Sequence, residues 1–456
     1  MATLLALCCC LSSAHSQWLE KTLYLPDSFG RWVSPWCLVY NPANNTIYAG
    51  GEGGDCVFAI DGATNQMTAR IPDGSLVQAL CCNPAYNKVY CANHGGGSVT
   101  VIDGATNGVI TTMGTGVDPH DLCYNPTNNK IYCANYSYGS NGSVAVVSGA
   151  TDSLIATVPA GEGPVALCYN ATNNKVYCSN CWSRNVTVID GPTERVITTV
   201  GPGGGALCYN STNNKVYCAG GNGVTVIDGA TNRVITTLTA GGSAICHNPT
   251  NNKVYCAGGN GVTVIDGATD SVIATVSAGQ GVQALCYNSM DNKVYCADYL
   301  SDSVAVIDCT TDSVIATVAA GANPFALCYN SENNKVYCAN SDGGNITVID
   351  CAANRAIATV TTRTGQWPLA LGYNSTDNKV YCANDGSSGN VAVIDGAADS
   401  IIATVPAGDN PYALCYNPHD NKVYCANRNS NTVTVIDRSE ERRVGKECRS
   451  RWSPYH

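Results

Sequence analysis

The chain has 456 residues, of which 13% are charged, and its formal net charge at pH 7 is −10. This acidic balance gives no electrostatic footprint for a phosphate backbone, so it excludes nucleic acid as a partner. Gly, Thr, Asn, Val and Ala dominate and helix formers are scarce, a composition typical of short strands joined by tight turns.

The N-terminal stretch 1–16, MATLLALCCCLSSAHS, joins an apolar run to small residues, as in a secretory signal cleaved before Gln17. No Lys or Arg precedes Lys21, so the usual positive start is missing, and a loosely packed N-terminal tail is the alternative. No later stretch reaches the roughly 18 apolar residues of a membrane span. We therefore predict an exported protein without a transmembrane segment, located outside the cell, on its surface or in the periplasm.

A phrase close to CYNPTNNKIYCAN returns along the whole chain. The intervals between successive copies of its central Tyr run from 38 to 45 residues, which fits propeller blades of four strands each. Helical repeats of this length would show a 3.6-residue periodicity instead. The ten tyrosines are Tyr48, Tyr90, Tyr132, Tyr177, Tyr217, Tyr255, Tyr295, Tyr337, Tyr381 and Tyr424.

One unit, from Gly163 to Val200, shows the composition of a blade. Four β-rich runs, ALCYN, KVYCSN, VTVID and VITTV, are separated by turn-forming residues, and we name them strands a, b, c and d. They lack a clean alternation of apolar and polar residues, as expected where neighbouring blades cover both faces of each sheet. The sequence thus predicts an all-β fold, a β-propeller of about ten blades, over residues 17–437.

The ends of the array predict how the ring closes. The run TLYLP, from Thr22 to Pro26, aligns with strand d, whereas the last unit stops after its c strand at Asp437. The N-terminal strand can therefore complete the last blade. A ring of seven or eight blades with surplus repeats is the alternative, because typical propellers have four to eight blades.

The phrases KVYCAN, VTVIDGATN and VIATVPAG resemble the YVTN-type propeller repeats of surface-layer and other exported microbial proteins. The resemblance covers about residues 20–437. One departure is the repeated Cys after KVY, where members of that family usually carry Val or a similar residue.

The chain has 27 cysteines, eight of them at the ALC position and nine at the VYC position of the repeats. In 123–133, a four-residue loop with a left-handed Asn129 would place Cys123 opposite Tyr132, and Cys133 opposite Leu122. The two sulfurs would then leave opposite faces of the sheet and could not bond within the hairpin. This geometry favours buried thiols, whereas a five-residue loop would permit disulfides.

Two sets of loops connect the strands, and they differ in variability. The a-to-b and c-to-d loops are monotonous, and we interpret the repeated Asp of VID, such as Asp103, Asp190, Asp228 and Asp266, as a turn cap rather than a calcium ligand. The b-to-c and d-to-a loops vary and carry aromatic and Arg side chains, the residues that anchor interfaces. The alternative is that these side chains cap the core. The candidate binding residues are Trp32, Trp36, His120, Tyr136, Tyr138, Trp182, Arg184, Tyr299, Phe325, Trp367, Tyr412 and Arg428.

Signals for catalysis are few. The six histidines form no recurring constellation, and the sequence predicts no metal site and no cofactor. We therefore predict a non-enzymatic scaffold that binds a protein or glycan partner at the cell surface or envelope. The alternative is a lyase or hydrolase at the channel mouth, where His120 stands near Asp118 and Asp121.

The last nineteen residues, 438–456, match nothing in the repeats and contain six Lys and Arg. A basic binding tail is one interpretation. We favour a non-native or disordered extension that takes no part in the fold.

Overall fold

A computed structural model describes residues 18–24, 34–52, 56–72, 76–220, 223–239, 242, 244–258, 261–362, 367–386 and 388–437. The predicted signal 1–16 and the predicted tail 438–456 lie outside the described residues. Among the described residues, the helical structure is one 3-10 turn, η1 (Pro84–Tyr86). No helix in these ranges has the length and apolarity needed to cross a membrane.

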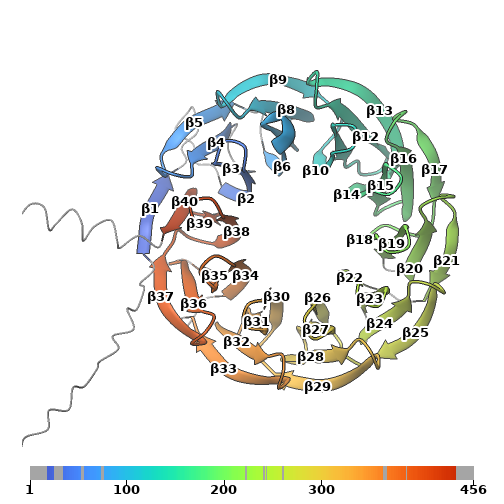
Figure 1. Cartoon of the computed structure of the whole chain (residues 1–456). Coiled ribbons are helices and arrows are strands. Elements are labelled where there is room, and N and C mark those ends of the chain that lie inside the picture. Colours follow the sequence, from blue (N-terminus) through green and yellow to red (C-terminus); the bar gives the residue numbers. More distant parts are fainter. Residues whose placement is uncertain are drawn as a thin grey trace, which may run out of the picture.

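Ten antiparallel sheets of four strands stand side by side in a ring around a central axis (Figure 1). This confirms the predicted all-β propeller with ten blades, and the seven- or eight-bladed alternative is wrong. In every blade strand a is innermost and strand d is outermost. We number the blades 1 to 10 from β2 onward.

Every a strand ends at the same Asn of the repeat, and every b strand begins at the same position, which is Lys in nine blades and Thr46 in β3. The a strands are β2 (Ser34–Asn41), β6 (Val77–Asn83), β10 (Pro119–Asn125), β14 (Pro164–Asn170), β18 (Leu207–Asn210), β22 (Ala244–Asn248), β26 (Val282–Asn288), β30 (Pro324–Asn330), β34 (Trp367–Asn374) and β38 (Pro411–Asn417). The b strands are β3 (Thr46–Glu52), β7 (Lys88–Asn93), β11 (Lys130–Asn135), β15 (Lys175–Asn180), β19 (Lys215–Gly220), β23 (Lys253–Gly258), β27 (Lys293–Asp298), β31 (Lys335–Asn340), β35 (Lys379–Asp385) and β39 (Lys422–Asn427).

The outer two strands follow in the same order. The c strands are β4 (Cys56–Asp61), β8 (Ser98–Asp103), β12 (Asn141–Ser148), β16 (Asn185–Asp190), β20 (Gly223–Asp228), β24 (Gly261–Asp266), β28 (Ser303–Asp308), β32 (Asn345–Asp350), β36 (Asn390–Asp395) and β40 (Thr432–Asp437). The d strands are β5 (Met67–Pro72), β9 (Gly108–Gly114), β13 (Ser153–Glu162), β17 (Val196–Val200), β21 (Val234–Leu238), β25 (Ser271–Val276), β29 (Ser313–Ala319), β33 (Arg355–Thr361), β37 (Ser400–Pro406) and β1 (Trp18–Tyr24).

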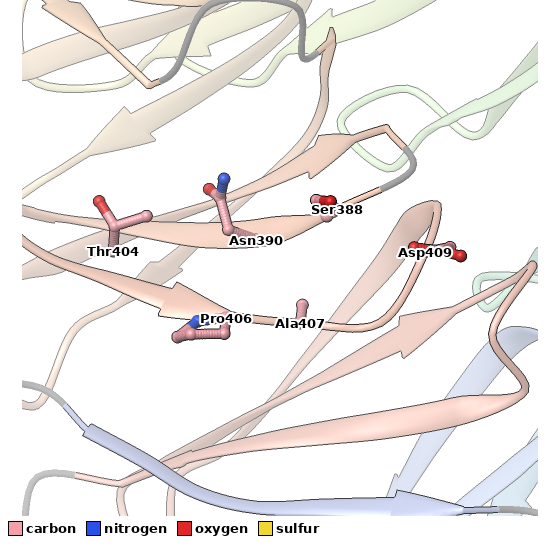
Figure 2. A pocket seen from close by; sticks show the side chains of 7 residues that line it. Ser388, Asn390, Thr404, Pro406, Ala407 and Asp409 are labelled. Atoms are coloured by element: carbon pink, nitrogen blue, oxygen red, sulfur yellow. The ribbon is translucent and has the colours of Figure 1, made fainter.

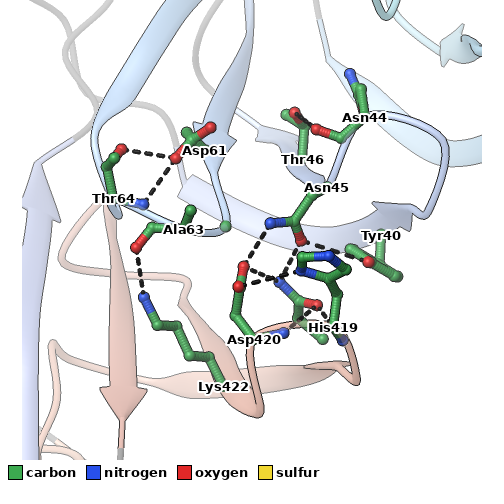
Figure 3. A network of polar contacts seen from close by, with 12 residues as sticks. Tyr40, Asn44, Asn45, Thr46, Asp61, Ala63, Thr64, His419, Asp420 and Lys422 are labelled. Carbon is green, nitrogen blue, oxygen red and sulfur yellow. Dashed lines mark hydrogen bonds and ion pairs between the residues drawn. The ribbon is translucent and has the colours of Figure 1, made fainter. Parts of the chain in front are cut away.

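The ring closes through the N-terminal strand, as the sequence predicted. β1 pairs with β40, and Thr22 lies opposite Thr434. At the same seam, the Lys422 ammonium donates to the Ala63 carbonyl at 3.1 Å, and the Asn45 amide donates to the Asp420 carboxylate at 2.5 Å (Figure 3). The chain ends are therefore joined by both a β ladder and side-chain contacts.

Buried asparagines connect each blade to the next. The Asn that ends strand a donates from Nδ2 to Oδ1 of the turn Asn in the following blade, at 2.6 to 2.9 Å. The acceptor Asn has φ between 51° and 56°, a left-handed conformation that Asn tolerates better than most residues. The ten pairs are Asn41–Asn87, Asn83–Asn129, Asn125–Asn174, Asn170–Asn214, Asn210–Asn252, Asn248–Asn292, Asn288–Asn334, Asn330–Asn378, Asn374–Asn421 and Asn417–Asn45.

The hydrophobic core lies between blades, not inside them. Tyr132 of blade 3 packs in one cluster with Val176 and Cys178 of blade 4, and all three side chains are fully buried. Burying an aliphatic side chain such as that of Val176 stabilises the fold by about 1.5–3 kcal/mol. A blade alone would expose these surfaces, so each blade depends on its neighbours for stability.

The predicted hairpin register is confirmed. Asn125 lies opposite Lys130, Cys123 opposite Tyr132, and Leu122 opposite Cys133. The two cysteines of the hairpin therefore project from opposite faces of the sheet. None of the 23 cysteines in the described ranges forms a disulfide.

Each outer strand carries a β-bulge at the same position. In blade 5, Val234 and Thr236 pair with consecutive residues of strand c, so Ile235 between them has no ladder partner. A bulge bends an exposed edge and hinders pairing with another chain. The bulged residue is Ile in eight blades, namely Ile110, Ile155, Ile197, Ile235, Ile273, Ile315, Ile357 and Ile402.

Candidate binding face

The b-to-c and d-to-a loops form one face of the ring, which we call the variable face. Within a blade these loops share a recurrent backbone bond. Tyr136 donates its N–H to the Asp118 carbonyl at 2.9 Å, and Arg428 donates to the Asn410 carbonyl at 2.8 Å. The acceptors Asp118 and Asn410 have φ of 47° and 54°. The same backbone hydrogen bond thus holds loops of different sequence in similar positions.

Four predicted binding residues meet on the variable face of blades 3 and 4, and we call them the aromatic cluster: His120, Tyr136, Tyr138 and Trp182. The His120 and Tyr136 rings lie 5.8 Å apart, and Tyr138 meets Trp182 edge to face at 5.2 Å. The Trp182 indole N–H donates to the Tyr136 hydroxyl at 2.5 Å. Tyr138 is 76% exposed and Trp182 is 51% exposed. The cluster therefore presents two large aromatic surfaces to solvent.

Backbone contacts fix the position of this cluster. The Glu162 carboxylate accepts the Gly139 N–H at 2.7 Å and so holds the loop that carries Tyr138. Gly163 has φ of 71°, and a Cβ there would lie 2.3 Å from Cδ1 of Trp182. Gly163 is thus required both for its backbone conformation and for the close approach of the indole. Rigid aromatic side chains bind with little loss of conformational entropy.

The chemical environment of His120 is that of a packed side chain. Burial lowers the pKa of His120, and a nearby His94 lowers it further, whereas Asp121 opposes the shift. The Asp121 carboxylate accepts the N–H of Leu122 and of Leu167, each at 2.9 Å, and Leu167 belongs to blade 4. Burial raises the pKa of Asp121. Asp121 therefore links two a strands, and this geometry gives no support to the predicted acid–base site at His120.

The remaining candidates are spread over other parts of the variable face. Arg184 is exposed, and its carbonyl accepts the Gly203 N–H, while Tyr299 is half-buried. Phe325 and Trp367 are exposed. Trp36 lies near the start of β2, but its side chain is outside the described part of the structure. Trp32 lies wholly outside the described residues.

A second aromatic group occurs at blade 10. The Arg428 guanidinium lies 5.8 Å from the centre of the Tyr412 ring, and Tyr412 is exposed. Cation–π contacts of this kind contribute about 0.5–1 kcal/mol at exposed sites. β38, which contains Tyr412, and β10, which contains His120, lie in different arcs of the ring (Figure 1).

A Cys-Ser-Asn-Cys run beside the cluster was not recognised as a candidate from the sequence. Cys178 is fully buried in β15, whereas Cys181 is half-buried in the loop that carries Trp182. Burial raises the pKa of both thiols. A reactive cysteine needs a lowered pKa, so this pair has the properties of structural thiols.

The opposite face serves the fold. The Asp228 carboxylate accepts the Thr231 N–H at 2.6 Å, and that of Asp266 accepts the Thr269 N–H at 2.8 Å. These backbone hydrogen bonds lower the pKa of Asp228 and of Asp266. The predicted turn-capping role is confirmed. Within the described ranges, no cluster of three His, Cys, Asp or Glu could hold a metal ion.

Comparisons with known proteins show the fold and no family. No family model and no curated protein matches the chain. The structure of dihydro-heme d1 dehydrogenase NirN in complex with DHE is similar, with a TM-score of 0.57 and 13% identity over 86% of this chain and 79% of NirN. A eukaryotic initiation factor has a TM-score of 0.52 and 12% identity over 77% of this chain and 92% of its own. Kuenenia stuttgartiensis hydrazine synthase has a TM-score of 0.44 and 16% identity, over 89% and 96% of the chains.

The comparison with NirN corrects one prediction. We predicted that the protein is not an enzyme, because catalytic constellations do not recur in its repeats. NirN is described as a dehydrogenase and has a similar propeller, so the prediction is contradicted. The physical reason is that a propeller carries its special residues in single loops, where they need not recur from blade to blade.

Proposed function

We propose that this protein is an exported propeller of the YVTN type that binds a protein or glycan partner through its variable face. In this proposal the ring is a scaffold at the cell surface or in the envelope, and the aromatic cluster is the main anchor. The repeat phrases and the signal-like segment 1–16 support the family and the export. The propeller itself supplies a rigid base for loops of different sequence.

The observation that carries the proposal is the exposure of Tyr138 and Trp182 in fixed positions. Both rings are at least half exposed, and the hydrogen bond from Trp182 to Tyr136 holds the indole in place. Exposed Trp and Tyr dominate the binding energy of interfaces. Gly163 has no side chain where the Trp182 indole lies, so the backbone itself leaves the space that the indole occupies.

Capture experiments on the full chain test this proposal. Biotinylated protein is screened against envelope extracts and a glycan array, first unmodified and then as Trp182→Ala and Tyr138→Ala. Truncating a central anchor costs about 2 kcal/mol or more, so we expect at least tenfold weaker capture. The matched control is Tyr86→Ala, because Tyr86 is also 51% exposed but lies on the opposite face. Equal capture by all three variants would remove the basis for this face.

The export part is tested separately. The full-length gene is expressed, and the cell fractions are probed for the protein by intact-mass measurement. We expect a mature form that begins at Gln17 outside the cytoplasm. An uncleaved cytoplasmic chain would contradict export without affecting the assignment of the binding face.

A further inference from the structure

A cavity of about 340 Å³ opens on the variable face of blade 9 (Figure 2). It lies where the start of β36 faces the end of β37, and the loop after β37 closes one side of it. This volume falls at the small end of the range for ligand sites, which is roughly 300–1,000 Å³. The lining residues are Ser388, Gly389, Asn390, Thr404, Pro406, Ala407 and Asp409.

Backbone hydrogen bonds form the cavity before any ligand binds. Ala407 donates its N–H to the Gly389 carbonyl at 2.9 Å, so a backbone hydrogen bond joins the two walls of the cavity. A Cβ on Gly389 would lie 2.3 Å from the Gly408 carbonyl oxygen and 2.3 Å from Cδ of Pro411, so a larger residue does not fit. The Asn390 side chain is held as well, since its Oδ1 accepts from the Asn384 amide at 2.7 Å.

The lining combines hydroxyl, amide and carboxylate groups with a small apolar surface. Ser388 and Thr404 can both donate and accept, and the carboxylate of Asp409 accepts only. Pro406 and Ala407 supply the apolar part. No Lys, Arg or His is among the residues that line the cavity, so the Asp409 charge disfavours anions there. The chemistry that fits is a small, neutral molecule with several hydroxyl groups.

The cavity also adjoins the second aromatic group through a shared loop. Asn429 donates its N–H to the Asp409 carbonyl at 3.1 Å, and Arg428 donates to the Asn410 carbonyl at 2.8 Å. The loop 407–410 thus lines the cavity through Ala407 and Asp409 and is bonded to the loop that carries Arg428. A ligand longer than one ring could extend from the cavity toward the Arg428–Tyr412 pair.

We propose that this cavity binds one neutral sugar residue of a glycan. The sugar hydroxyl groups donate to Asp409 and exchange hydrogen bonds with Thr404, while a C–H face of the ring packs on Pro406. The proposal rests on the proposed function, in that it names a glycan as the partner, but it uses a different site from the aromatic cluster.

Titrations with free sugars test the proposal. The full-length protein is titrated with glucose, galactose, mannose and N-acetylglucosamine, and with glucuronate as the anionic comparison, by calorimetry and ligand-observed NMR. We expect saturable binding of at least one neutral sugar and weaker binding of glucuronate. Asp409→Asn and Thr404→Val should each weaken binding about tenfold, the size of one charge-assisted or well-formed hydrogen bond. Thr317→Val, at the equivalent position of β29 in blade 7, is the matched control and should bind as the unmodified protein does.

The possible outcomes distinguish failure of the cavity proposal from failure of the proposed function of the aromatic cluster. If no neutral sugar binds, or if Asp409→Asn and Thr404→Val bind unchanged while their circular dichroism shows a folded ring, the cavity proposal is overturned. Preferred binding of glucuronate also overturns it. Partner capture that depends on Trp182 would still stand in those cases. Loss of capture by the aromatic cluster with intact sugar binding in blade 9 would instead overturn the proposed function of the cluster alone.

Discussion

Asn417 donates a hydrogen bond from its side-chain amide to the side-chain oxygen of Asn45 at 2.9 Å, across 372 residues of sequence. The equivalent hydrogen bond joins all the remaining pairs of neighbouring blades. In blades 1 to 9, however, the c and d strands follow one another along the chain. In blade 10 the d strand is β1, and its pairing with β40 replaces that covalent link.

The closing seam should therefore open first. Asn417→Ala and the internal equivalent Asn210→Ala each remove one interblade bond, and each should lower the free energy of unfolding by about 1–2 kcal/mol. Hydrogen exchange should distinguish them, because only Asn417→Ala should speed exchange in β1 and β38–β40. Similar exchange in β1 for the two variants would show that the seam is no weaker than the others.

The lysine that begins strand b has a charged partner in blade 5 but a neutral partner in blade 4, so the effect of losing each lysine on stability can be compared. Lys215 contacts the Asp270 carboxylate at 2.6 Å, whereas Lys175 contacts the neutral side chain of Asn232 at 2.7 Å. Lys215→Met leaves the mostly buried Asp270 carboxylate without its cationic partner, so it should cost about 3 kcal/mol, against about 1 kcal/mol for Lys175→Met. Urea unfolding measures both.

A double variant checks the cause of that difference. Lys215→Met combined with Asp270→Asn removes the unpaired charge and should recover much of the lost stability. If the double variant is as unstable as Lys215→Met alone, the cost arises from lost packing and not from the buried charge.

Stability should fall on mild acidification, partly through His120. Burial lowers the pKa of His120 in the folded state, and its ordinary value near 6.5 applies when unfolded. The contribution of neutral His120 is therefore complete above about pH 6.5 and is lost as the pH falls from there toward the lowered pKa. His247, whose pKa burial also lowers, acts in the same direction. Asp121 has a raised pKa and acts oppositely, in the more acidic range.

Urea midpoints measured between pH 5.5 and 7.5 test this dependence. His120→Gln should flatten the curve relative to the unmodified protein. An unchanged slope in His120→Gln would assign the acid sensitivity to other groups.

The geometry of the c-to-d turn at Gly229 predicts how much stability is lost when this residue gains a methyl group. A Cβ at Gly229 would lie 2.4 Å from the Asn214 carbonyl oxygen, and Gly229 donates to that oxygen at 2.9 Å. Blades 7 and 8 carry Cys309 and Cys351 at this position, and there the same bond is 3.1 and 3.2 Å long. The turn can thus yield slightly, so Gly229→Ala should destabilise by only about 1 kcal/mol. A loss above about 3 kcal/mol in thermal unfolding would contradict this reading.

The thiols should be protected in the native ring. Burial raises the pKa of Cys168 to about 12, and that of Cys133 further still, so both remain protonated and covered at neutral pH. Iodoacetamide at pH 7.5 should label few sites on the native protein, with Cys181 among them, and all cysteines in urea. Unlabelled pairs in urea, detected by intact mass, would reveal disulfides instead.

The fold could be predicted because its signals are local and repeated. A hairpin register such as Asn125 opposite Lys130 depends only on the turn between them, and the sequence of that turn recurs in most blades. The partner of each turn Asn could not be predicted in this way, because Asn129 receives its bond from Asn83, 46 residues earlier. Their local sequence predicts only that these asparagines form turns.

The candidate site was predicted as a face but not as a cluster. Loop length indicated which face carries variation, yet the meeting of Trp182 with Tyr136 depends on how loops of successive blades lean, which no local pattern encodes. The blade 9 cavity is lined by small residues such as Gly389 and Ala407, whose types carry no functional signal.

The pairing of β1 with β40 also sets an order for biosynthesis. A ribosome makes β1 before every other strand of the ring but delivers its partner β40 only after all the strands between them have emerged. Until then the first strand must wait without its ladder, while middle blades can already stack on one another. Blade 10 is consequently the last of the ten blades that can complete its sheet during synthesis.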